Sequence, residues 1–300
     1  MELKIYWAVA AVFCISAVVV LLVGWIGCER GIHPEPTPEE YDLSQFDLPR
    51  PEDVHFESRD GLRLAGWFLP GTNGATVILT HGRGGNRTWM LPHADYLHRN
   101  GFSVLLFDFR FHGKSEGDVH TLGAKEPWDV EAAVDYLKAR PDVDTERIGV
   151  QGNSLGAVAA IFAAAERPEL KGVIADVPFK SLSSVIDHSF RRLVGLPSFP
   201  FAPVSKFFWE LRLGINMEDV EPVKVIGKIS PRPVFLIDDL EDDPLPSDSV
   251  EAVYQAAREP KELWQIPECS PHGKGWECKG EEYERRVLAF WRKTFGIAQP

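Results

Sequence analysis

Residues 146–166 read ERIGVQGNSLGAVAAIFAAAE. Within this short stretch the pattern changes from that of a strand to that of a turn and then to that of a helix. The first part, 146–152, has the short, partly β-branched pattern of a buried strand and ends in glycine. The last part, 155–166, is rich in alanine and predicts a helix. The two parts meet in GNSLG (152–156), which leaves no room for a loop. The segment therefore predicts a strand that turns sharply into a helix, with Ser154 at the turn.

Ser154 is a candidate nucleophile because of this position. A sharp turn holds its central residue in a strained backbone conformation, which neighbouring glycines make tolerable. The turn would expose the hydroxyl at the sheet edge and at a helix amino terminus, where the helix dipole and free amides favour developing negative charge. A G-x-S-x-G pattern alone is common, and an ordinary strand-to-helix turn is the alternative interpretation.

The rest of the chain alternates between strand and helix patterns. Residues 54–70 predict a β-hairpin around Asp60-Gly61. Further strands are predicted at 75–82, 102–109, 172–177, 231–239 and 262–267, and further helices at 88–100, 128–140, 249–258 and 283–295. This order predicts one α/β domain with a mostly parallel, twisted sheet and helices on both faces. Residues 179–225 interrupt it and are expected to form a small cap over the carboxyl edge of the sheet, where ligands bind in such folds.

A serine hydroxyl needs a base to take its proton, and the chain has nine histidines. His272 follows the last predicted strand, in a loop before the final helix. It comes after Ser154 and after the acidic stretch IDDLEDDPLP (237–246), in the chain order Ser…Asp…His. Two of the others, His81 and His112, are expected before glycines in loops after strands. Two more, His93 and His98, are expected on a surface helix. Five acids compete to orient the imidazole: Asp238, Asp239, Glu241, Asp242 and Asp243.

These motifs resemble those of the α/β-hydrolase superfamily, most of all the single-span, membrane-anchored Bem-type serine hydrolases and their bacterial relatives. The resemblance covers about residues 53–296. Besides GNSLG it rests on four motifs in the family's order: HGRGGN (81–86), DFRFHGKSEG (108–117), IDDLEDDPLP (237–246) and SPHG (270–273). Phe111 stands where the family has glycine, and Asp238 and Asp239 replace a His-Gly pair.

The resemblance implies an α/β-hydrolase fold over residues 53–298 and a triad of Ser154, His272 and Asp242. His272 would deprotonate Ser154 for attack on an acyl carbonyl, and Asp242 would fix the imidazole tautomer. The backbone amides of Leu155 and Arg83 would hold the oxyanion. Water activated by His272 would then release the acid, and no metal or organic cofactor is needed.

The amino terminus predicts a membrane anchor. Residues 5–27 carry no charge and would span about 34 Å as a helix, enough for a bilayer core of about 30 Å. An uncleaved single-span helix is expected there, followed by a linker over residues 28–52. A cleaved signal peptide and lipidation of Cys28 are the alternatives. The numbers of Lys and Arg residues on the two sides of this helix are nearly equal. The small difference favours a catalytic domain outside the cytoplasm.

Two cysteines bracket His272 in ECSPHGKGWEC (268–278). The Cys-x2-His-x5-Cys spacing matches no common zinc site. In an oxidising compartment Cys269 and Cys278 are expected to form a disulfide, which would stabilise the fold by about 2.7 kcal/mol and limit the motion of the His272 loop. In the cytosol they would be free thiols.

The net charge of -12 gives no support to nucleic-acid binding. The aromatic cap and the predicted anchor favour a hydrophobic acyl substrate, a small molecule or a lipid-like compound with an ester or thioester bond. A serine peptidase of prolyl-peptidase type is the second interpretation. A membrane-tethered binding module without activity is the third.

Overall fold

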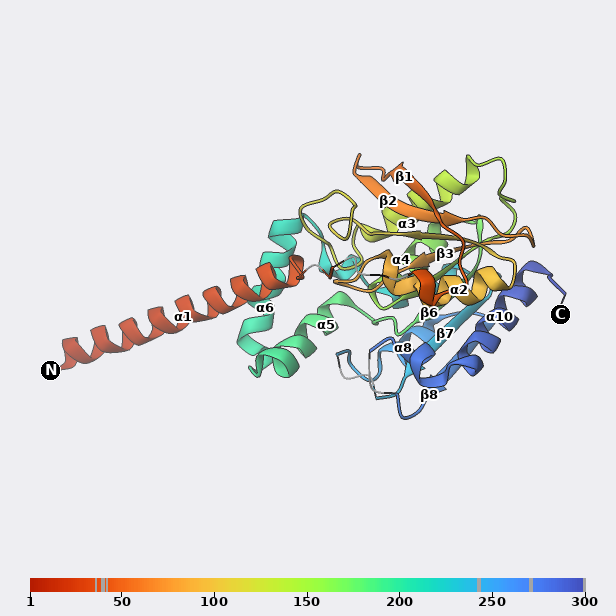
Figure 1. Cartoon of the computed structure of the whole chain (residues 1–300). Helices are drawn as coiled ribbons and strands as arrows, with labels where there is room; N and C mark the ends of the chain where they lie inside the picture. The colour runs from red at the N-terminus through yellow and green to blue at the C-terminus, as the bar shows by residue number, and fades with distance from the viewer. Residues whose placement is uncertain (36, 39–40, 42, 242–243, 270–271, 299–300) are drawn as a thin grey trace.

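A computed structural model of the chain describes residues 1–35, 37–38, 41, 43–241, 244–269 and 272–298. Its centre is an eight-stranded sheet in the order β1-β2-β4-β3-β5-β6-β7-β8 (Figure 1). Antiparallel pairing joins β1 (Glu52–Glu57) to β2 (Arg63–Leu69), and β2 to β4 (Ser103–Phe107). All other pairs are parallel and involve β3 (Thr76–Thr80), β5 (Ile148–Asn153), β6 (Leu170–Asp176), β7 (Val234–Asp239) and β8 (Lys261–Ile266). The predicted hairpin and the predicted mostly parallel sheet are confirmed.

Helices cover both faces of this sheet. One face packs against α3 (Glu126–Lys138), α4 (Leu155–Glu166) and α8 (Ser249–Ala256). The other packs against α2 (Leu91–Arg99), which follows the short η2 (Arg87–Met90), and against α10 (Glu281–Phe295). Ile78 belongs to the first core, whereas Val77 and Leu79 belong to the second. Because side chains alternate across a strand, β3 is buried on both sides and has an apolar centre, Val77–Leu79, between two threonines.

The cap lies between β6 and β7 and is helical. It contains α5 (Leu182–Ser189), the π-helix η3 (Phe190–Val194), α6 (Ser198–Leu213), η4 (Met217–Asp219), α7 (Pro222–Val225) and η5 (Ile226–Lys228). Its buried side chains form a third apolar core together with Leu155 and Val158 of α4. Since Leu155 directly follows Ser154, the cap is built over the nucleophile turn. Two short helices elsewhere are η1 (Leu43–Gln45) and α9 (Gly275–Lys279).

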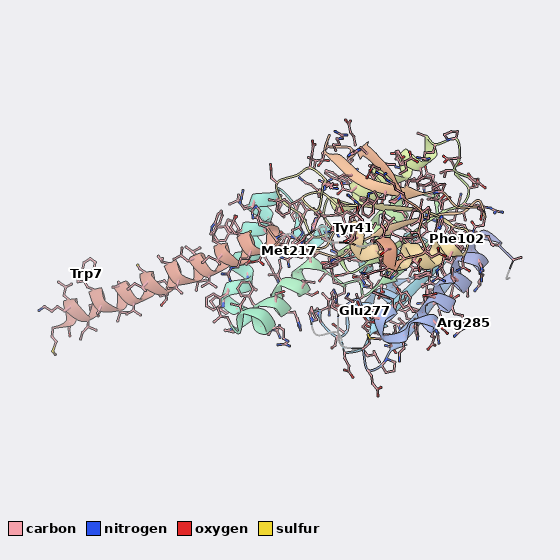
Figure 2. The ribbon with its side chains drawn as sticks, viewed as in Figure 1. Trp7, Tyr41, Phe102, Met217, Glu277 and Arg285 are labelled. Atoms are coloured by element: carbon pink, nitrogen blue, oxygen red, sulfur yellow. A yellow bond between two sulfur atoms is a disulfide. The ribbon has the colours of Figure 1, made fainter. Side chains whose placement is uncertain are left out.

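The amino-terminal helix is longer than predicted. α1 (Glu2–Ile32) continues through residues 28–32, which the sequence assigned to a linker. The physical reason is contact with the cap, since Cys28 and Ile32 are fully buried in the third core. The outer part of α1, including Trp7, projects away from the domain (Figures 1 and 2). By length and composition α1 is a candidate transmembrane helix.

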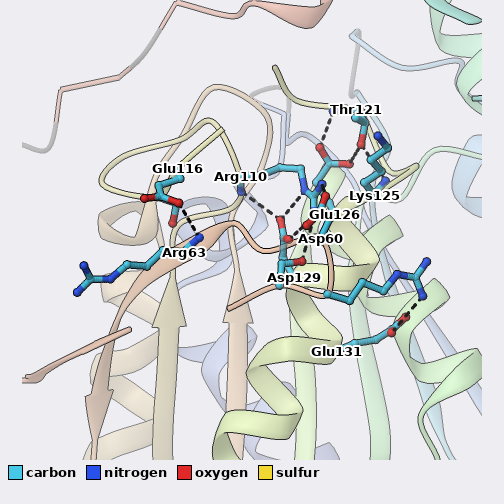
Figure 3. A network of polar contacts seen from close by, with 12 residues as sticks. Asp60, Arg63, Arg110, Glu116, Thr121, Lys125, Glu126, Asp129 and Glu131 are labelled. Carbon is cyan, nitrogen blue, oxygen red and sulfur yellow. Dashed lines mark hydrogen bonds and ion pairs between the residues drawn. The ribbon is translucent and has the colours of Figure 1, made fainter. Parts of the chain in front are cut away.

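A buried arginine ties three segments beneath the loop that follows β4. The Arg110 side chain donates to both carboxylate oxygens of Asp129 on α3, from Nη2 (2.6 Å) and Nε (3.0 Å). Its Nη1 donates to Asp60 in the hairpin turn (2.7 Å), as Figure 3 shows. Asp129 is fully buried, so its charge depends on Arg110 for compensation.

Replacing Asp129 with Ala should therefore cost about 3–5 kcal/mol of unfolding free energy, because it leaves the Arg110 charge buried without its main partner. Asp135→Ala on the same helix is the matched control, since Asp135 pairs with Arg167 but its side chain is 64% exposed. That control should lose at most about 1 kcal/mol. Denaturant unfolding in detergent measures both, and equal losses would contradict the assignment.

Candidate active site

The turn that carries Ser154 has the predicted strain. Ser154 adopts φ 53° and ψ -114° at the start of α4, and its amide donates to the Asp176 carbonyl (2.8 Å). A Cβ on Gly152 would lie 2.3 Å from the Gly156 carbonyl carbon, and a Cβ on Gly156 would lie 2.4 Å from the Thr80 carbonyl oxygen. Both positions therefore admit only glycine. The turn is pressed against the end of β3, which fixes the Ser154 hydroxyl at the carboxyl edge of the sheet.

The structure brings His272 to this serine from a distant part of the chain. His272 Nε2 lies 2.7 Å from Ser154 Oγ, within hydrogen-bond distance. The next residue, Gly273, accepts a hydrogen bond from the Asn153 side chain through its carbonyl oxygen (3.0 Å). Lys274 donates its amide to Asp239 Oδ2 at the end of β7 (3.1 Å). The histidine loop is thus fastened to the nucleophile turn and to β7, by Asn153 and Asp239, which sequence analysis did not single out for this purpose.

A disulfide joins Cys269 and Cys278 on the two sides of His272. The sulfurs are bonded to each other and are therefore not thiolate ligands for a metal. Within the described part of the chain no group of three or more His, Cys, Asp or Glu side chains is placed to hold a metal ion. The bond constrains the loop that carries His272. The conformation of this loop sets the distance between His272 and Ser154.

The acid predicted for the triad, Asp242, lies outside the described residues, and so does Asp243. The three other competing acids are described: Glu241 is exposed, and Asp238 and Asp239 have partners of their own. Asp238 accepts from the Gln265 side chain (3.2 Å), and Asp239 accepts from the Lys274 amide (3.1 Å). Both are buried at the end of β7, where they brace the edge of the sheet.

Two buried histidines hold the loop that contains Arg83. His81 Nδ1 donates to the Gly82 carbonyl (2.7 Å), and its Nε2 accepts from the Phe109 amide (3.1 Å). His112 Nδ1 donates to the Arg110 carbonyl (2.8 Å), and its Nε2 accepts from the Gly84 amide (3.1 Å). Each ring donates once and accepts once, which requires the neutral form. Their positions before glycines in loops were predicted, but their role as supports of the Arg83 loop was not.

The neutral state of these rings has an electrostatic cause. Burial, with smaller contributions from the nearby His112 and Arg87, lowers the pKa of His81 to about 3. Burial also lowers the pKa of His112. The prediction that His93 lies on a surface helix is wrong, because His93 is only 3% exposed and its pKa is lowered to about 3, chiefly by burial. His93 packs edge-on against Trp276 and Tyr283, so the helix that carries it is covered by the carboxyl-terminal part of the chain.

A cavity of about 980 Å³ contains the catalytic candidates. Ser154 and His272 line it together with Leu155 and Arg83, the two residues predicted to supply oxyanion amides. Its remaining walls are mainly apolar and come from the cap, from α2 and from the segment before β1. The cavity is within the size range of small-molecule sites.

One wall of the cavity was not foreseen, because it belongs to α1. Gly27, Arg30 and Gly31 line the same space as Ser154. The Arg83 guanidinium donates from Nη2 to the carbonyl oxygens of Arg30 and Gly31 (3.0 Å each). His120 Nε2 lies 2.7 Å from the Gly31 carbonyl oxygen. The last turn of α1 is therefore bonded directly to the loop beside the nucleophile.

Comparison with known proteins agrees with this architecture. Residues 71–206 match the family model described as serine aminopeptidase, S33. The Mycobacterium tuberculosis protein Rv2307c is 31% identical over 86% of this chain and 85% of its own length. The Arabidopsis thaliana α/β-hydrolase domain-containing protein WAV2 is 30% identical over 81% of this chain and 79% of its own length. The chain belongs to the α/β-hydrolase family.

A solved structure extends the likeness to three dimensions. The Pyrococcus furiosus esterase Pf2001 superposes with a TM-score of 0.73 and 28% identity, covering 88% of this chain and 98% of the esterase. The family and this neighbour support hydrolase activity. The α/β-hydrolase resemblance given by the sequence motifs is confirmed at this level.

The disulfide gives a testable stability difference. Cys269→Ser together with Cys278→Ser should lower the unfolding free energy by about 2.7 kcal/mol, because the unfolded chain regains the freedom of the closed loop. Cys14→Ser, at an exposed cysteine of α1, should leave the stability unchanged. Thermal unfolding of protein purified from an oxidising compartment measures the difference. Reactive thiols at residues 269 and 278 in that native protein, or equal melting of the two variants, would contradict the bond.

Proposed function

We propose that this α/β-hydrolase is a membrane-anchored serine hydrolase that cleaves carboxylic ester or thioester bonds through an acyl-enzyme intermediate. Ser154 is the nucleophile, His272 the general base and acid, and Asp242 the residue that orients the imidazole. The observation that carries the proposal is the 2.7 Å contact between His272 Nε2 and Ser154 Oγ on a strained turn that lines a largely apolar cavity. Nucleophile and base within hydrogen-bond reach are what covalent acyl transfer requires.

In the proposed reaction His272 Nε2 takes the proton of Ser154 as its oxygen attacks the acyl carbonyl carbon. The electron pair of the carbonyl moves to oxygen, and the amides of Leu155 and Arg83 stabilise the resulting negative charge. His272 then gives its proton to the leaving alcohol or thiol, and an ester to Ser154 remains. A water molecule repeats the sequence with His272 as base, which releases the acid and restores the serine.

The proposed anchor is α1 itself, retained in the mature protein. Cleavage before Cys28 would remove Gly27 from the cavity wall and would strip Val23 and Gly24 from their contacts with the cap. Lipidation of Cys28 is disfavoured by its position, since its side chain is fully buried in the third core. The disulfide beside His272 favours a catalytic domain outside the cytoplasm, because such bonds persist in oxidising compartments.

The walls of the cavity favour an acyl chain as the part of the substrate that it holds. Apolar side chains of the cap, among them Ile186, Phe190 and Trp209, stand opposite the nucleophile. A hydrophobic chain bound there would leave water and gain about 0.8 kcal/mol for each buried methylene group. Activity should therefore rise with acyl length until the cavity is filled.

A serine peptidase is the second candidate, favoured by the description of the matching family model. Peptidases and esterases share the nucleophile and the base, so the triad geometry does not separate them. The apolar cavity walls favour the esterase assignment. Direct comparison of ester, thioester and peptide turnover by one preparation would separate the two.

The nucleophile is testable by active-site labelling. A fluorophosphonate probe should label the wild-type chain and should fail to label Ser154→Ala, because the probe captures only an activated serine. A series of acyl esters should be hydrolysed with increasing kcat/KM as the chain lengthens. Labelling that survives in Ser154→Ala would contradict the assigned nucleophile. Labelling without turnover of any ester, but with turnover of peptides, would support the peptidase instead.

The acid is testable by two matched substitutions. Asp242→Asn should lower kcat between about 10³-fold and 10⁴-fold, because the imidazole loses the partner that fixes its tautomer. Asp239→Asn removes a carboxylate that braces the Lys274 amide, and should lower kcat by no more than about tenfold. Steady-state kinetics on a short ester give both values. A larger loss in Asp239→Asn would move the acid to the end of β7.

A further inference from the structure

We infer that α6 and the neighbouring cap residues dock onto the surface of the lipid bilayer that α1 enters, and that the acyl cavity is filled from that leaflet. The inference rests on the proposed function, because it assigns the substrate to amphipathic acyl compounds that reside in the membrane. It adds a docking surface, a route and a set of residues that the hydrolase assignment alone does not contain.

The first observation is an exposed apolar stripe on the cap. Pro203, Phe207 and Leu211 recur every four residues along α6 and are exposed, and Phe199 is exposed just before them, at a kink in the helix. Phe199 is 78% exposed, Phe207 59% and Leu211 66%. After α1, seven large apolar side chains of the described residues are exposed, and four of them lie within residues 194–211. Such clustering on one short segment indicates an apolar partner rather than scattered surface residues.

The stripe is continuous with the surface of α1. The Trp25 ring contacts Phe208 edge-on at 5.2 Å between centroids, and Phe208 contacts Phe207 at 5.6 Å. An unbroken run of aromatic rings thus leads from the candidate transmembrane helix to the stripe. Figure 1 shows α6 beside α1 at the point where α1 leaves the domain. Tryptophan at this position is typical of a membrane–water interface.

The length of α1 determines where the stripe lies relative to the bilayer. Its first residue in contact with the cap core is Val23. The preceding uncharged residues, 5–22, would span about 27 Å as a helix, close to the thickness of a bilayer core of about 30 Å. The contact with the cap therefore begins where the hydrocarbon ends. A cap that begins at this end of the membrane-spanning part of α1 lies in the headgroup layer.

The helix and the cap are held together rigidly rather than through a loose tether. A Cβ on Gly24 would lie 2.6 Å from Val204, and a Cβ on Gly31 would lie 2.2 Å from Trp209, so only glycine permits this approach. The Glu29 carboxylate accepts from Arg212 Nε on α6 (2.9 Å). Together with the Arg83 contacts to the end of α1, these bonds fix the orientation of the cap relative to the bilayer.

Charge on the same segment suits the headgroup layer. Arg191 and Arg192 lie in η3, immediately before the stripe, and both are exposed. Basic side chains beside exposed aromatic and aliphatic residues are the composition of segments that lie in a membrane interface. The chain as a whole is acidic, so this local combination runs against its average composition.

The cavity reaches the same region. Phe190, Val194 and Ser205 line it from the cap, Gly27 lines it from α1, and Ser154 lines the same cavity. An acyl chain that enters this cavity from the leaflet would therefore meet apolar side chains on its way to the nucleophile. This path keeps the chain out of water during transfer.

The full-length chain in phosphatidylcholine vesicles with some anionic phosphatidylglycerol tests the route. Phe207→Asp combined with Leu211→Asp should lower turnover of a long-chain acyl ester embedded in the vesicles at least about tenfold, because charge opposes insertion of the stripe. Turnover of a short, water-soluble ester should change less than about twofold, since neither residue lines the cavity. Ala139→Asp, at an exposed residue that follows α3 and lies outside the cavity lining, is the control and should change neither rate.

The two hypotheses fail in different ways. Absent Ser154-dependent turnover of the soluble ester would overturn the proposed function. Normal turnover of the soluble ester combined with an unchanged rate on the vesicle ester would overturn the docking surface. A proportional fall in both rates would also overturn it, since the stripe would then act on the fold rather than on substrate delivery.

A readout without activity tests the docking itself. An environment-sensitive fluorophore on Leu211→Cys, in a chain that also carries Cys14→Ser, should be quenched by lipids that bear a nitroxide near the headgroup. The same label on Leu240→Cys should not be quenched. Absent quenching at residue 211, or a signal that depends on the protein-to-lipid ratio, would assign the stripe to a protein contact and overturn the proposal.

Discussion

The close approach of the nucleophile turn to β3 is the constraint on which the rest of the site depends. Gly152 and Gly156 have no space for a side chain, and Ser154 accepts a left-handed conformation between them. Thr80 Oγ1 donates to the Gly156 carbonyl (3.1 Å), which fastens the first turn of α4 to the adjacent strand. Because the turn cannot relax without separating β3 from β5, the strain is carried by the sheet. The serine is thereby held in one place for partners that arrive from other parts of the chain.

The histidine needs separate support, because its loop has no strand or long helix of its own. Asn153 and Asp239 hold the residues immediately after His272, and the disulfide closes the loop around it. A Cβ on Gly273 would lie 2.3 Å from the Asn153 side chain, so glycine at this position follows from the same contact. The two motifs GNSLG and SPHG are thus two halves of one interface. An error of about 1 Å in such an arrangement is costly to catalysis, which accounts for three independent fastenings.

Local patterns in the sequence predict the parts of the molecule whose contacts are local or periodic. The strands, the helices that cover them, the turn at Ser154 and the choice of His272 follow from spacing, residue type and chain order. The linker assigned to residues 28–32 was wrong because the helix there is stabilised by contacts with residues about 180 positions later, around Trp209. His93 was misplaced for a similar reason, since residues 276 and 283 cover its helix. Phe111 adopts φ 65°, a conformation that favours glycine. The structure therefore explains why the family has glycine at this position of the motif, but not why this chain has phenylalanine.

The end of α1 is bonded to the loop that carries Arg83, although the two segments lie far apart in the sequence. Arg83 supplies its backbone to the proposed oxyanion site and its side chain to the carbonyl oxygens of Arg30 and Gly31. Those carbonyls are the unsatisfied acceptors that every helix leaves at its carboxyl end, and they carry partial negative charge. The guanidinium therefore has a favourable electrostatic reason to remain there, and its position restrains the loop beside Ser154. The proposed anchor and the proposed oxyanion site consequently share one set of bonds, so a change in the position of α1 would reach the loop beside Ser154 through Arg83 and its neighbours.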